Sequence, residues 1–302
     1  MKNGVLIDAH SHLWLKQDTM VDGKVIRSLK NGRSIFMDEE VQMLPPFMID
    51  GVNSAEVFLS NMNYAQVGAA VVVQEVIDGN QNEYLKEVQR RYPDRFFCMA
   101  MAFTLEEAKQ AHADGFRGIA IPGHRLKESL LGKMDMFKFM ESQGMILSMC
   151  LADDERQIAE MGEVIEECPL LKVAIGHFGM PTTESFESQV RLALKGERVM
   201  VESGGITWLY NSEFYPFPSA IRSIRRAAEL VGMERLMWGS DYPTVLFACT
   251  YQQHIDIVTK HCDFLTDEEM ERITALSLDH SEIINHFDPN VVKFILGRKI
   301  HD

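Results

Sequence analysis

Short apolar runs rich in β-branched residues recur along this chain and alternate with amphipathic stretches. Runs that are hydrophobic almost throughout are typical of parallel strands buried on both faces. An alternation of strand and helix that reaches eight units favours a closed (β/α)₈ TIM barrel of the α/β class, with an open parallel sheet as the alternative. The predicted strands are Val5–Ala9, Ala69–Gln74, Phe96–Phe103, Gly118–Pro122, Met145–Leu151, Lys172–Phe178, Val199–Ser203 and Arg235–Asp241.

The stretches between these runs have helical periodicity and, in several cases, recognisable ends. Thr104, followed by Glu106 and Glu107, predicts a helix start, and Gly115 predicts the end of the same helix. A chain of 302 residues suits one barrel of ~250 residues with insertions, so we expect a single domain over residues 1–302. The predicted helices are Asn80–Tyr92, Thr104–Asp114, Met134–Gln143, Asp154–Cys168, Thr183–Lys195, Pro218–Val231 and Thr250–Cys262.

The connection after the first predicted strand, residues 15–53, has no good helical pattern. Its Asn31-Gly32 pair is a strong turn signal between two strands of a hairpin. Loops that follow the strands of a barrel lie at its C-terminal face, where active sites are found. We therefore expect a hairpin-bearing insertion over that face. This insertion either presents Arg27, Lys30 or Arg33 to the site or is an exposed segment without a role in the site, whose charges are solvated.

Two histidines stand two positions apart where the first predicted strand ends. The alternation of side chains along a strand turns His10 and His12 toward the same side, into the barrel mouth. A lone histidine is more often structural than a ligand, but a spaced pair directly after a buried strand is a rarer arrangement. We interpret both as functional residues.

Two further polar residues end predicted strands at the same rim. His177 follows an apolar run that ends in Gly176, and Asp241 precedes Tyr242-Pro243, where proline prevents the strand from continuing. A carboxylate at that position is expensive to bury unless it is paired or functional. The alternative for Asp241 is a cap on the following helix.

The segments around these four residues resemble the signatures of a known enzyme family. They are Ile7–Trp14 (IDAHSHLW), Ile175–His177 (IGH) and Met237–Pro243 (MWGSDYP), with supporting marks at Ala70–Gln74, Phe116–Ile119 and Val201–Gly204. The chain resembles the amidohydrolase-related (amidohydrolase 2) family of the amidohydrolase superfamily over about residues 5–245. The nearest branch is that of the sugar lactonases and 2-pyrone-4,6-dicarboxylate lactonase. The long insertion departs from the family pattern, so the resemblance does not assign a substrate.

The resemblance implies a site with at most one metal ion. The fourth strand, Gly118–Pro122, has no Lys or Glu to bridge two metals, and the fifth, Ser148–Leu151, has no terminal His. A single zinc or manganese ion held by His10, His12 and Asp241 is one expectation, and metal-independent action is the other. Cys150 is either a further ligand or a buried structural thiol. No organic cofactor is expected.

Candidate substrate contacts lie at other strand ends. Gln74 ends the second strand and bonds either the substrate or a neighbouring loop. His124 and Arg125 follow the fourth strand and either bind a carboxylate or hydroxyl groups or belong to a solvent-facing loop. Weaker candidates, and histidines expected outside the site, are Glu202, Tyr210 and Tyr215, and His112, His254, His261, His280, His286 and His301.

The function implied is that of a hydrolase that opens a sugar-acid or carboxylated lactone by direct attack of water. Asp241 would be the general base, and His177 would polarise the carbonyl with the His10/His12 pair or a metal that they hold. The alternative is a mononuclear-metal-dependent decarboxylase of a carboxylated small molecule. A third hypothesis is a barrel that binds a metabolite without catalysis.

Composition limits the classes of molecule that this chain is expected to bind. A formal net charge of −14 repels phosphate backbones, so no nucleic acid is expected. The N-terminal segment lacks signal-peptide features, and no apolar run reaches the ~20 residues of a membrane span. Five cysteines without CxxC spacing indicate reduced thiols and a cytoplasmic location. We expect a small-molecule substrate, with a role in carbohydrate catabolism by analogy with the family, and homo-oligomeric assembly stays open.

Overall fold

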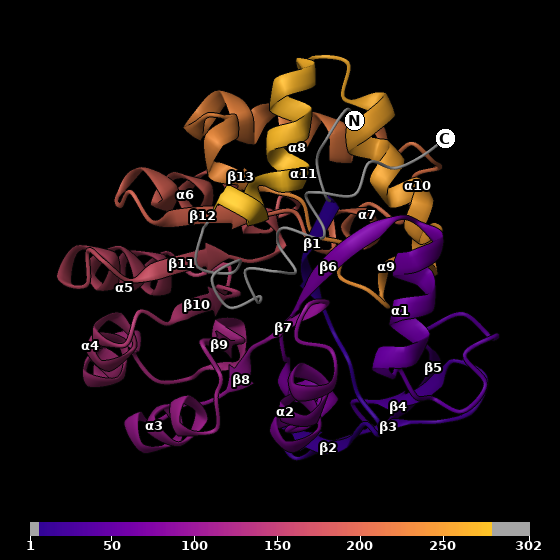
Figure 1. The fold of residues 1–302 in the computed structure, drawn as a ribbon, viewed down its shortest axis with the longest axis horizontal. Helices are drawn as coiled ribbons and strands as arrows, with labels where there is room; N and C mark the ends of the chain where they lie inside the picture. The colour runs from indigo at the N-terminus through magenta and orange to yellow at the C-terminus, as the bar shows by residue number, and fades with distance from the viewer. Residues whose placement is uncertain (1–5, 280–302) are drawn as a thin grey trace.

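The computed structural model describes residues 6–279, and within them every predicted strand run contributes a parallel barrel strand (Figure 1). The strands alternate with helices in chain order, which confirms the predicted α/β class and barrel architecture. Their bounds are β1 (Leu6–Ser11), β6 (Val67–Val72), β7 (Phe96–Cys98), β8 (Ala100–Met101), β9 (Gly118–Ile121), β10 (Ile146–Met149), β11 (Lys172–Ile175), β12 (Val199–Glu202) and β13 (Leu236–Met237).

Hydrogen bonds connect the ends of this strand order. β7 and β8 are consecutive halves of one strand, and β7 pairs with β6 while β8 pairs with β9. Between the first and last strands, Ala9 N donates to Trp238 O at 3.0 Å and Asp241 N donates to His10 O at 2.8 Å. These bonds place His10 and Asp241 side by side.

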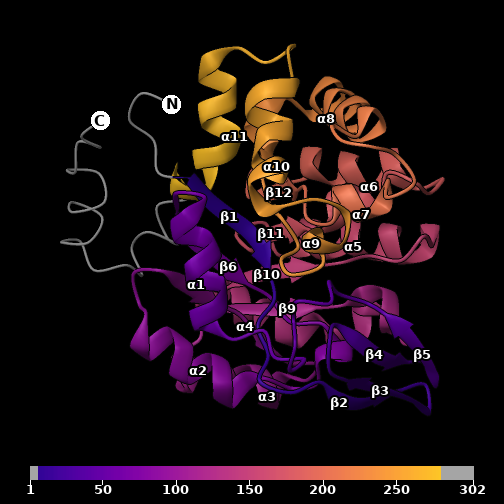
Figure 2. The ribbon, with the colours of Figure 1, turned by 90° about the vertical axis from the view of Figure 1, so that its right-hand side faces the viewer.

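Most helices form an outer layer around the strands (Figures 1 and 2). The predicted helices are confirmed within a few residues, and Thr104 forms a capping box with Glu107. The α-helices are α1 (Ala55–Tyr64), α2 (Asn82–Arg91), α3 (Leu105–Ala113), α4 (Met134–Ser142), α5 (Glu155–Glu167), α6 (Phe186–Arg191), α7 (Ile206–Leu209), α8 (Pro218–Val231), α9 (Val245–Ala248), α10 (Tyr251–Asp256) and α11 (Asp267–Asp279). Short 3₁₀ or π turns are η1 (Val76–Asp78), η2 (Gly123–Arg125), η3 (Leu130–Lys133), η4 (His177–Gly179), η5 (Leu192–Leu194), η6 (Met233–Arg235) and η7 (Ile257–His261).

Helix α1 was not among the predicted helices. Its sequence is mixed, but Ser54 caps its first turn by accepting a hydrogen bond from Val57 N, and Ala55, Phe58 and Met62 form its buried face. That spacing of apolar residues, behind a capping serine, is the signal that could have predicted it.

The insertion after β1 forms a four-stranded antiparallel sheet, which Figure 2 shows apart from the barrel strands. Its strands are β2 (Asp18–Val21), β3 (Lys24–Ser28), β4 (Arg33–Phe36) and β5 (Glu39–Gln42). The predicted Asn31-Gly32 turn joins β3 to β4, and both residues have positive φ, as that turn signal requires. The hairpin prediction is confirmed and extended, because two further hairpins complete the sheet.

The interior of the barrel is filled by a separate apolar cluster. Ile7 packs there against side chains of β6 and β7, and Ala9 packs against Met200 and Met237. Uninterrupted alternation would turn His10 away from this interior, but the register between β1 and β6 shifts between Asp8 and Ser11. This irregularity turns His10 toward Glu202, with its Nδ1 2.8 Å from the Glu202 carboxylate.

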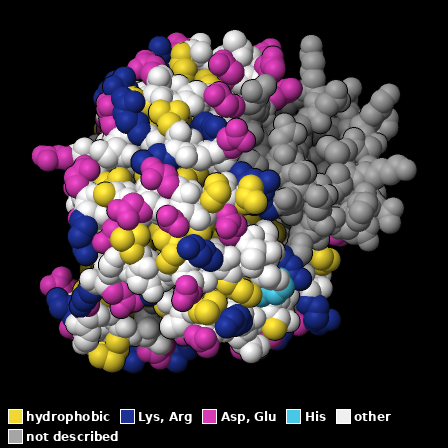
Figure 3. All heavy atoms as spheres, turned by 90° about the vertical axis from the view of Figure 1, so that its left-hand side faces the viewer, with side chains coloured by type: hydrophobic (Ala, Val, Ile, Leu, Met, Phe, Trp, Pro, Cys, Tyr) yellow, Lys and Arg dark blue, Asp and Glu magenta, His cyan; other side chains and the backbone are white. Residues whose placement is uncertain are grey.

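The outer surface is ordinary for a globular chain. Figure 3, which views the side that carries α3 to α6, shows acidic and basic side chains interspersed, with hydrophobic ones in small groups. Of the helices in residues 6–279, none combines the length and the apolar character of a membrane span.

Candidate active site

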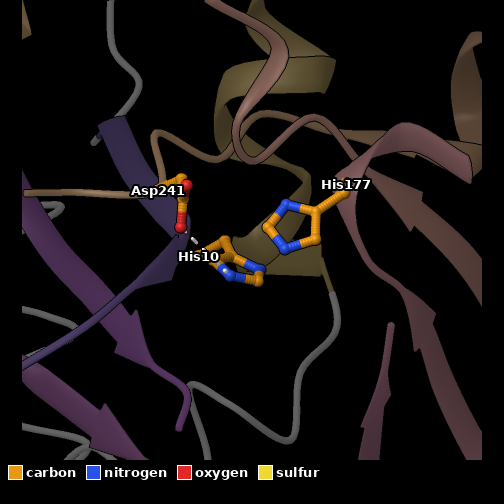
Figure 4. A group of neighbouring side chains, drawn as sticks. All are labelled: His10, His177 and Asp241. Atoms are coloured by element: carbon orange, nitrogen blue, oxygen red, sulfur yellow. Dashed lines mark ion pairs between the residues drawn. The ribbon is translucent and has the colours of Figure 1, made fainter. Parts of the chain in front are cut away.

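The structure brings His10, His12, His177 and Asp241 together at the mouth of the barrel, as the sequence predicted. His12 Nε2 lies 3.1 Å from His10 Nε2 and 3.0 Å from Asp241 Oδ1. His10 Nε2 lies 3.6 Å from the same oxygen, and the His10 and His177 ring centroids are 4.8 Å apart. Figure 4 shows Asp241 and His177 reaching toward His10 from opposite sides.

The backbone turns sharply where two of these residues leave their strands. His177 has φ 50° and Asp241 has φ 60°, in the left-handed region that residues with a side chain rarely adopt. Phe178 and Met180 share this conformation. Each such residue costs ~1–3 kcal/mol, and such strain clusters at functional sites. The surroundings hold it in place, because Phe178 is fully buried and Asp241 N donates to His10 O at 2.8 Å.

Glu202, at the end of β12, fixes the orientation of the central histidine. The buried carboxylate accepts hydrogen bonds from His10 Nδ1 at 2.8 Å, His177 N at 2.9 Å and Gly204 N at 2.6 Å. Burial alone would raise the pKa of Glu202, but the neighbouring His10 and His177 and the Gly204 N–H lower it overall. The ionised Glu202 therefore fixes the His10 ring with Nδ1 toward itself and Nε2 toward His12 and Asp241.

Glycines leave the space that this carboxylate and His10 need. A Cβ on Gly204 would lie 2.7 Å from Glu202 Oε2 and 2.8 Å from His10 Cγ, and one on Gly239 would lie 2.9 Å from each residue. On Gly176 it would lie 3.0 Å from Glu202 Oε1. All three glycines follow barrel strands. Glycines at strand ends were therefore a further sequence signal for the site, besides the histidines.

His12 lies between two carboxylates. Its Nδ1 is 3.1 Å from Asp78 Oδ2 and its Nε2 is 3.0 Å from Asp241 Oδ1. Burial disfavours the charged ring, but the hydrogen bonds and charges of both aspartates raise the pKa of His12 well above its ordinary value. Asp78 is itself held by Gln17 Nε2 at 2.7 Å. His12 is therefore protonated on both nitrogens.

Asp241 has a different partner on each of its oxygens. Oδ1 faces the histidines, and Oδ2 accepts a hydrogen bond from the indole Nε1 of Trp208, in α7, at 2.6 Å. Burial would raise the pKa of Asp241, but the hydrogen bond and the charge of His12 lower it below the ordinary carboxyl range. The carboxylate is thus ionised and fixed in direction.

The ligand atoms of His10, His177 and Asp241 all lie within 4.8 Å of one another, so these residues could hold one metal ion. The predicted set of His10, His12 and Asp241 is also close together, because His12 Nε2 lies 3.1 Å from His10 Nε2 and 3.0 Å from Asp241 Oδ1, and it stays a prediction. Nδ1 of His177 faces Gly204 O at 3.1 Å, which leaves its Nε2 available as a ligand. Two imidazole nitrogens and a carboxylate suit a single divalent ion. Glu202 orients one of the two imidazoles, that of His10, by accepting a hydrogen bond from its Nδ1.

Cys150 is not part of this group among the described residues. Burial, and the nearby Glu202 and Glu75 carboxylates, raise the pKa of its thiol well above the ordinary value. The buried-thiol alternative is therefore favoured over the ligand alternative.

A cavity of about 470 Å³ opens directly above the group. His12, His177 and Asp241 lie at its base, and η2 and the inserted sheet line its walls. The lining residues are His12, Trp14, Gln17, Phe36, Met43, Leu44, Glu75, Ile77, Asp78, His124, Arg125, Cys150, Leu151, Ala152, Asp153, Gly176, His177, Met180, Thr183, Trp208, Asp241 and Thr244.

With this geometry in view, comparison with known proteins identifies the family. A sequence model of the amidohydrolase family matches residues 7–275. The chain belongs to the amidohydrolase family. The suspected family is thereby confirmed. No curated protein matches the sequence significantly.

Solved structures share the fold of this amidohydrolase at low sequence identity. A probable 2-pyrone-4,6-dicarboxylic acid hydrolase from Acinetobacter baumannii, with citric acid bound, is 19% identical at a TM-score of 0.58, covering 99% of this chain and 100% of that one. A zinc-bound amidohydrolase from Burkholderia multivorans is 14% identical at 0.67, covering 91% and 98%. The 5-carboxyvanillate decarboxylase of Sphingomonas paucimobilis is 12% identical at 0.51, covering 80% and 82%.

Gln74 bonds the protein around it with both ends of its amide. Its Nε2 donates to Asn82 Oδ1 at 2.7 Å and to Met99 O at 2.9 Å, and its Oε1 accepts from Gln81 N at 2.8 Å. The side chain is buried and lies outside the main cavity, but it lines a small pocket beside His10, His12 and His177. The loop-holding alternative is favoured, and contact with a substrate stays a prediction.

His124 and Arg125 line the cavity, as a substrate-contact prediction requires. Arg125 is already paired, with its Nε and Nη2 3.4 Å and 3.3 Å from the carboxylate oxygens of Glu75. His124 N donates to Cys150 O at 2.9 Å. Their contact with a substrate stays a prediction.

The inserted sheet lines the cavity with apolar side chains rather than cations. Arg27 pairs with Asp18 at 2.9 Å and Arg33 with Glu40 at 2.7 Å, on the exposed side, and Lys30 is also outside the lining. Of the two alternatives for these cations, the exposed one is favoured, because Arg27 and Arg33 pair within the sheet itself.

Three residues around the group escaped the sequence analysis. Asp78, Gln17 and Trp208 come from loops and a short helix without any motif, and only the fold brings them to the mouth. Tyr210 and Tyr215 bond elsewhere, to Ser223 and His261. His112, His254 and His261 do not line the cavity, and His280, His286 and His301 lie outside the described residues.

Proposed function

We propose that this amidohydrolase opens a lactone, or a related cyclic ester, by direct attack of water with Asp241 as the general base. The observation that carries the proposal is the position of Asp241. The carboxylate is ionised and fixed by Trp208 and His12, and it lies at the base of a cavity large enough for a small molecule. The name of the Acinetobacter protein, a probable 2-pyrone-4,6-dicarboxylic acid hydrolase, supports hydrolysis as the reaction class.

The reaction balances with the groups present. The oxygen of a water molecule forms a bond to the ester carbon, and its proton passes to Asp241. Although Asp241 is a weak base at rest, the proton becomes more acidic as the carbon–oxygen bond forms. Breakage of the ring carbon–oxygen bond then releases an alkoxide, which takes the proton from Asp241 and leaves a hydroxy acid.

In this reaction the histidines would stabilise the negative charge that develops on the carbonyl oxygen. The protonated His12, bonded to Asp78 and Asp241, is placed to stabilise the developing negative oxygen. His10 and His177 present lone pairs toward the same space and, with Asp241, would hold a divalent ion such as zinc or manganese. Such an ion would polarise the carbonyl and lower the pKa of water. Glu202 keeps His10 in the orientation that either role needs.

A decarboxylase is the second candidate. The shared fold of the 5-carboxyvanillate decarboxylase and the presence of Arg125 in the cavity wall favour it, because a carboxylate must be held there. The fifth strand counts against it, since Cys150 stands where the decarboxylase relatives are expected to have a histidine.

Metal content and Asp241→Asn together test the proposal. Wild-type protein is assayed for acid release from γ- and δ-lactones and for carbon dioxide release from aromatic acids, before and after chelation. Asp241→Asn should lower kcat/KM for lactones by about 10²–10⁴-fold. Asp263→Asn, the same change at an exposed residue outside the cavity, should stay within a few-fold. Unchanged activity in Asp241→Asn, or carbon dioxide release without lactone opening, would contradict the proposal.

A further inference from the structure

The charge of the cavity wall limits which substrates can enter. Four carboxylates line it, those of Glu75, Asp78, Asp153 and Asp241, against the single guanidinium of Arg125. Arg125 is already paired, because its Nε and Nη2 lie 3.4 Å and 3.3 Å from the two carboxylate oxygens of Glu75. Lysine is absent from the described lining residues. A substrate with two or more carboxylates would therefore meet repulsion, because the two cations in the lining, Arg125 and the protonated His12, are already paired with carboxylates.

The inserted sheet and its flanking loops make one wall apolar. Phe36, Met43 and Leu44 line the cavity together with Trp14. Trp14 donates its indole N–H to Gly51 O at 2.9 Å, so the ring presents carbon to the cavity. Trp14 and Leu44 also pack in one cluster with Met43 beside it. These contacts make the wall a packed surface rather than a set of mobile side chains.

Other residues of the lining are also apolar, namely Ile77, Leu151 and Met180. Two of the neutral polar residues are engaged with the protein, since Gln17 bonds both Asp78 and Ser28, and Thr183 donates to Met180 O at 2.8 Å. Hydroxyl groups of a sugar ring that lie against Phe36, Met43 or Leu44 would be buried against carbon, which is costly.

We infer that the natural substrate carries an apolar body, either a hydrocarbon ring or an alkyl chain, next to the ester and at most one carboxylate. This inference rests on the proposed function, because it takes Asp241 and the histidines around it as the reacting centre. The ester carbonyl lies at Asp241, and the apolar body lies under Phe36, Met43 and Leu44. A single carboxylate, where the substrate has one, lies at His124 and Arg125. The substrate therefore differs from the sugar acids and dicarboxylates that the family resemblance suggests.

Three lactones of similar size test the inference with the wild-type protein. They are γ-nonalactone, galactono-1,4-lactone and 2-pyrone-4,6-dicarboxylate, and the measured quantity is kcat/KM. The apolar lactone should exceed each of the others by about tenfold or more, because only its chain gains from burial against the apolar walls. Equal rates, or a preference for either polar lactone, would overturn the inference and leave the proposed function standing.

A matched pair of variants locates the preference. Met43→Gln places an amide in the wall, and Met20→Gln makes the same change on β2, where the side chain is exposed and outside the cavity. Met43→Gln should reduce the preference for γ-nonalactone about threefold or more, and Met20→Gln should leave it unchanged. Equal preferences in the two variants would show that the sheet does not select the substrate and would overturn the inference.

Binding separates this inference from the proposed reaction. Nonanoate, gluconate and pyridine-2,4-dicarboxylate are titrated into wild-type protein by calorimetry, which needs no catalysis. Tighter binding of nonanoate, without hydrolysis of any lactone, would support the apolar substrate and refute the lactone reaction. Tighter binding of gluconate or the dicarboxylate, or no binding of nonanoate, would overturn the inference whatever the reaction.

Discussion

The strand ends at the barrel mouth and the inserted sheet β2–β5 place their polar side chains in opposite ways. At the mouth, buried charged groups pair with one another, as in His10 with Glu202 and His12 with Asp78. In the sheet, charged groups such as Arg33 and Glu40 pair at the surface, while apolar side chains line the cavity. From this difference we expect the strand ends to carry the chemistry and the insertion to select the substrate.

The two regions also differ in what holds them together. The mouth depends on contacts between β1, β11, β12 and β13 that are far apart in the sequence, whereas each strand of the sheet pairs with its neighbour in sequence. A change at the mouth should therefore affect catalysis and stability together. A change in the sheet should affect the apparent affinity for the substrate with little effect on the barrel.

Glu202→Gln should show the largest effect of this kind. One carboxylate oxygen accepts from His10 and His177 N and the other accepts from Gly204 N, so an amide NH₂ must face at least one N–H donor. We expect a loss of about 10–100-fold in kcat/KM and about 2 kcal/mol in the free energy of unfolding. Steady-state kinetics and urea denaturation measure both.

An exposed carboxylate supplies the control for that variant. Glu187, which pairs with Arg226 at the surface at 2.7 Å, should tolerate the same change to Gln with little loss of stability or activity. Loss of activity in Glu202→Gln without loss of stability would also break the proposed coupling at the mouth.

The pH dependence of stability should also reside in the barrel. Burial lowers the pKa of His254 from 6.5 to about 4, with its Nε2 2.9 Å from Gly239 O. Because the folded pKa is below the unfolded one, the contribution is present above pH 6.5 and is lost as pH falls toward 4. Between pH 7.5 and 5 it should amount to about 2 kcal/mol. His254→Gln should remove that part of the pH dependence in urea denaturation, and an unchanged dependence would refute the assignment.

Trp208→Phe should have a smaller effect than Glu202→Gln, seen most clearly in catalysis. The substitution keeps an aromatic ring but removes the N–H that Asp241 Oδ2 accepts at 2.6 Å. A hydrogen bond to a charged group contributes ~1.5–3 kcal/mol, so kcat should fall about tenfold or more while KM changes little. Trp14→Phe is the control, because its N–H bonds Gly51 O rather than the reacting group. An equal loss of kcat in both variants would mean that the smaller size of the phenylalanine ring, and not the lost hydrogen bond to Asp241, lowers kcat.

The sequence predicted the barrel and its centre because both follow from local patterns. Apolar runs marked the strands, and the residues that end them, His177 and Asp241, share one rim as in any parallel barrel. The role of Gln74 could not be predicted in this way, since its partners come from the next strand and helix. Asp78 and Trp208 gave no local signal, because loops carry them to the mouth only after folding.

The surroundings of His10 and His12 show the same limit. His10 bonds one carboxylate through Nδ1, and His12 faces a carboxylate at each nitrogen. Contacts between residues more than sixty positions apart thus give different surroundings to two histidines that look equivalent in the sequence.

Gly32→Ala tests the inserted sheet with the smallest expected effect on chemistry. A Cβ at Gly32 would lie 2.2 Å from Leu44 O and 2.4 Å from Pro45 O, so Leu44 would have to move out of the cavity wall. Gly23→Ala is the control, because Gly23 has a similar positive φ of 78° with nothing within 4 Å of its Cβ. We expect KM for γ-nonalactone to rise about three- to tenfold in Gly32→Ala, with kcat and barrel stability nearly unchanged. If kcat falls as far as KM rises, the sheet also positions the reacting group, and the division between the two regions is wrong.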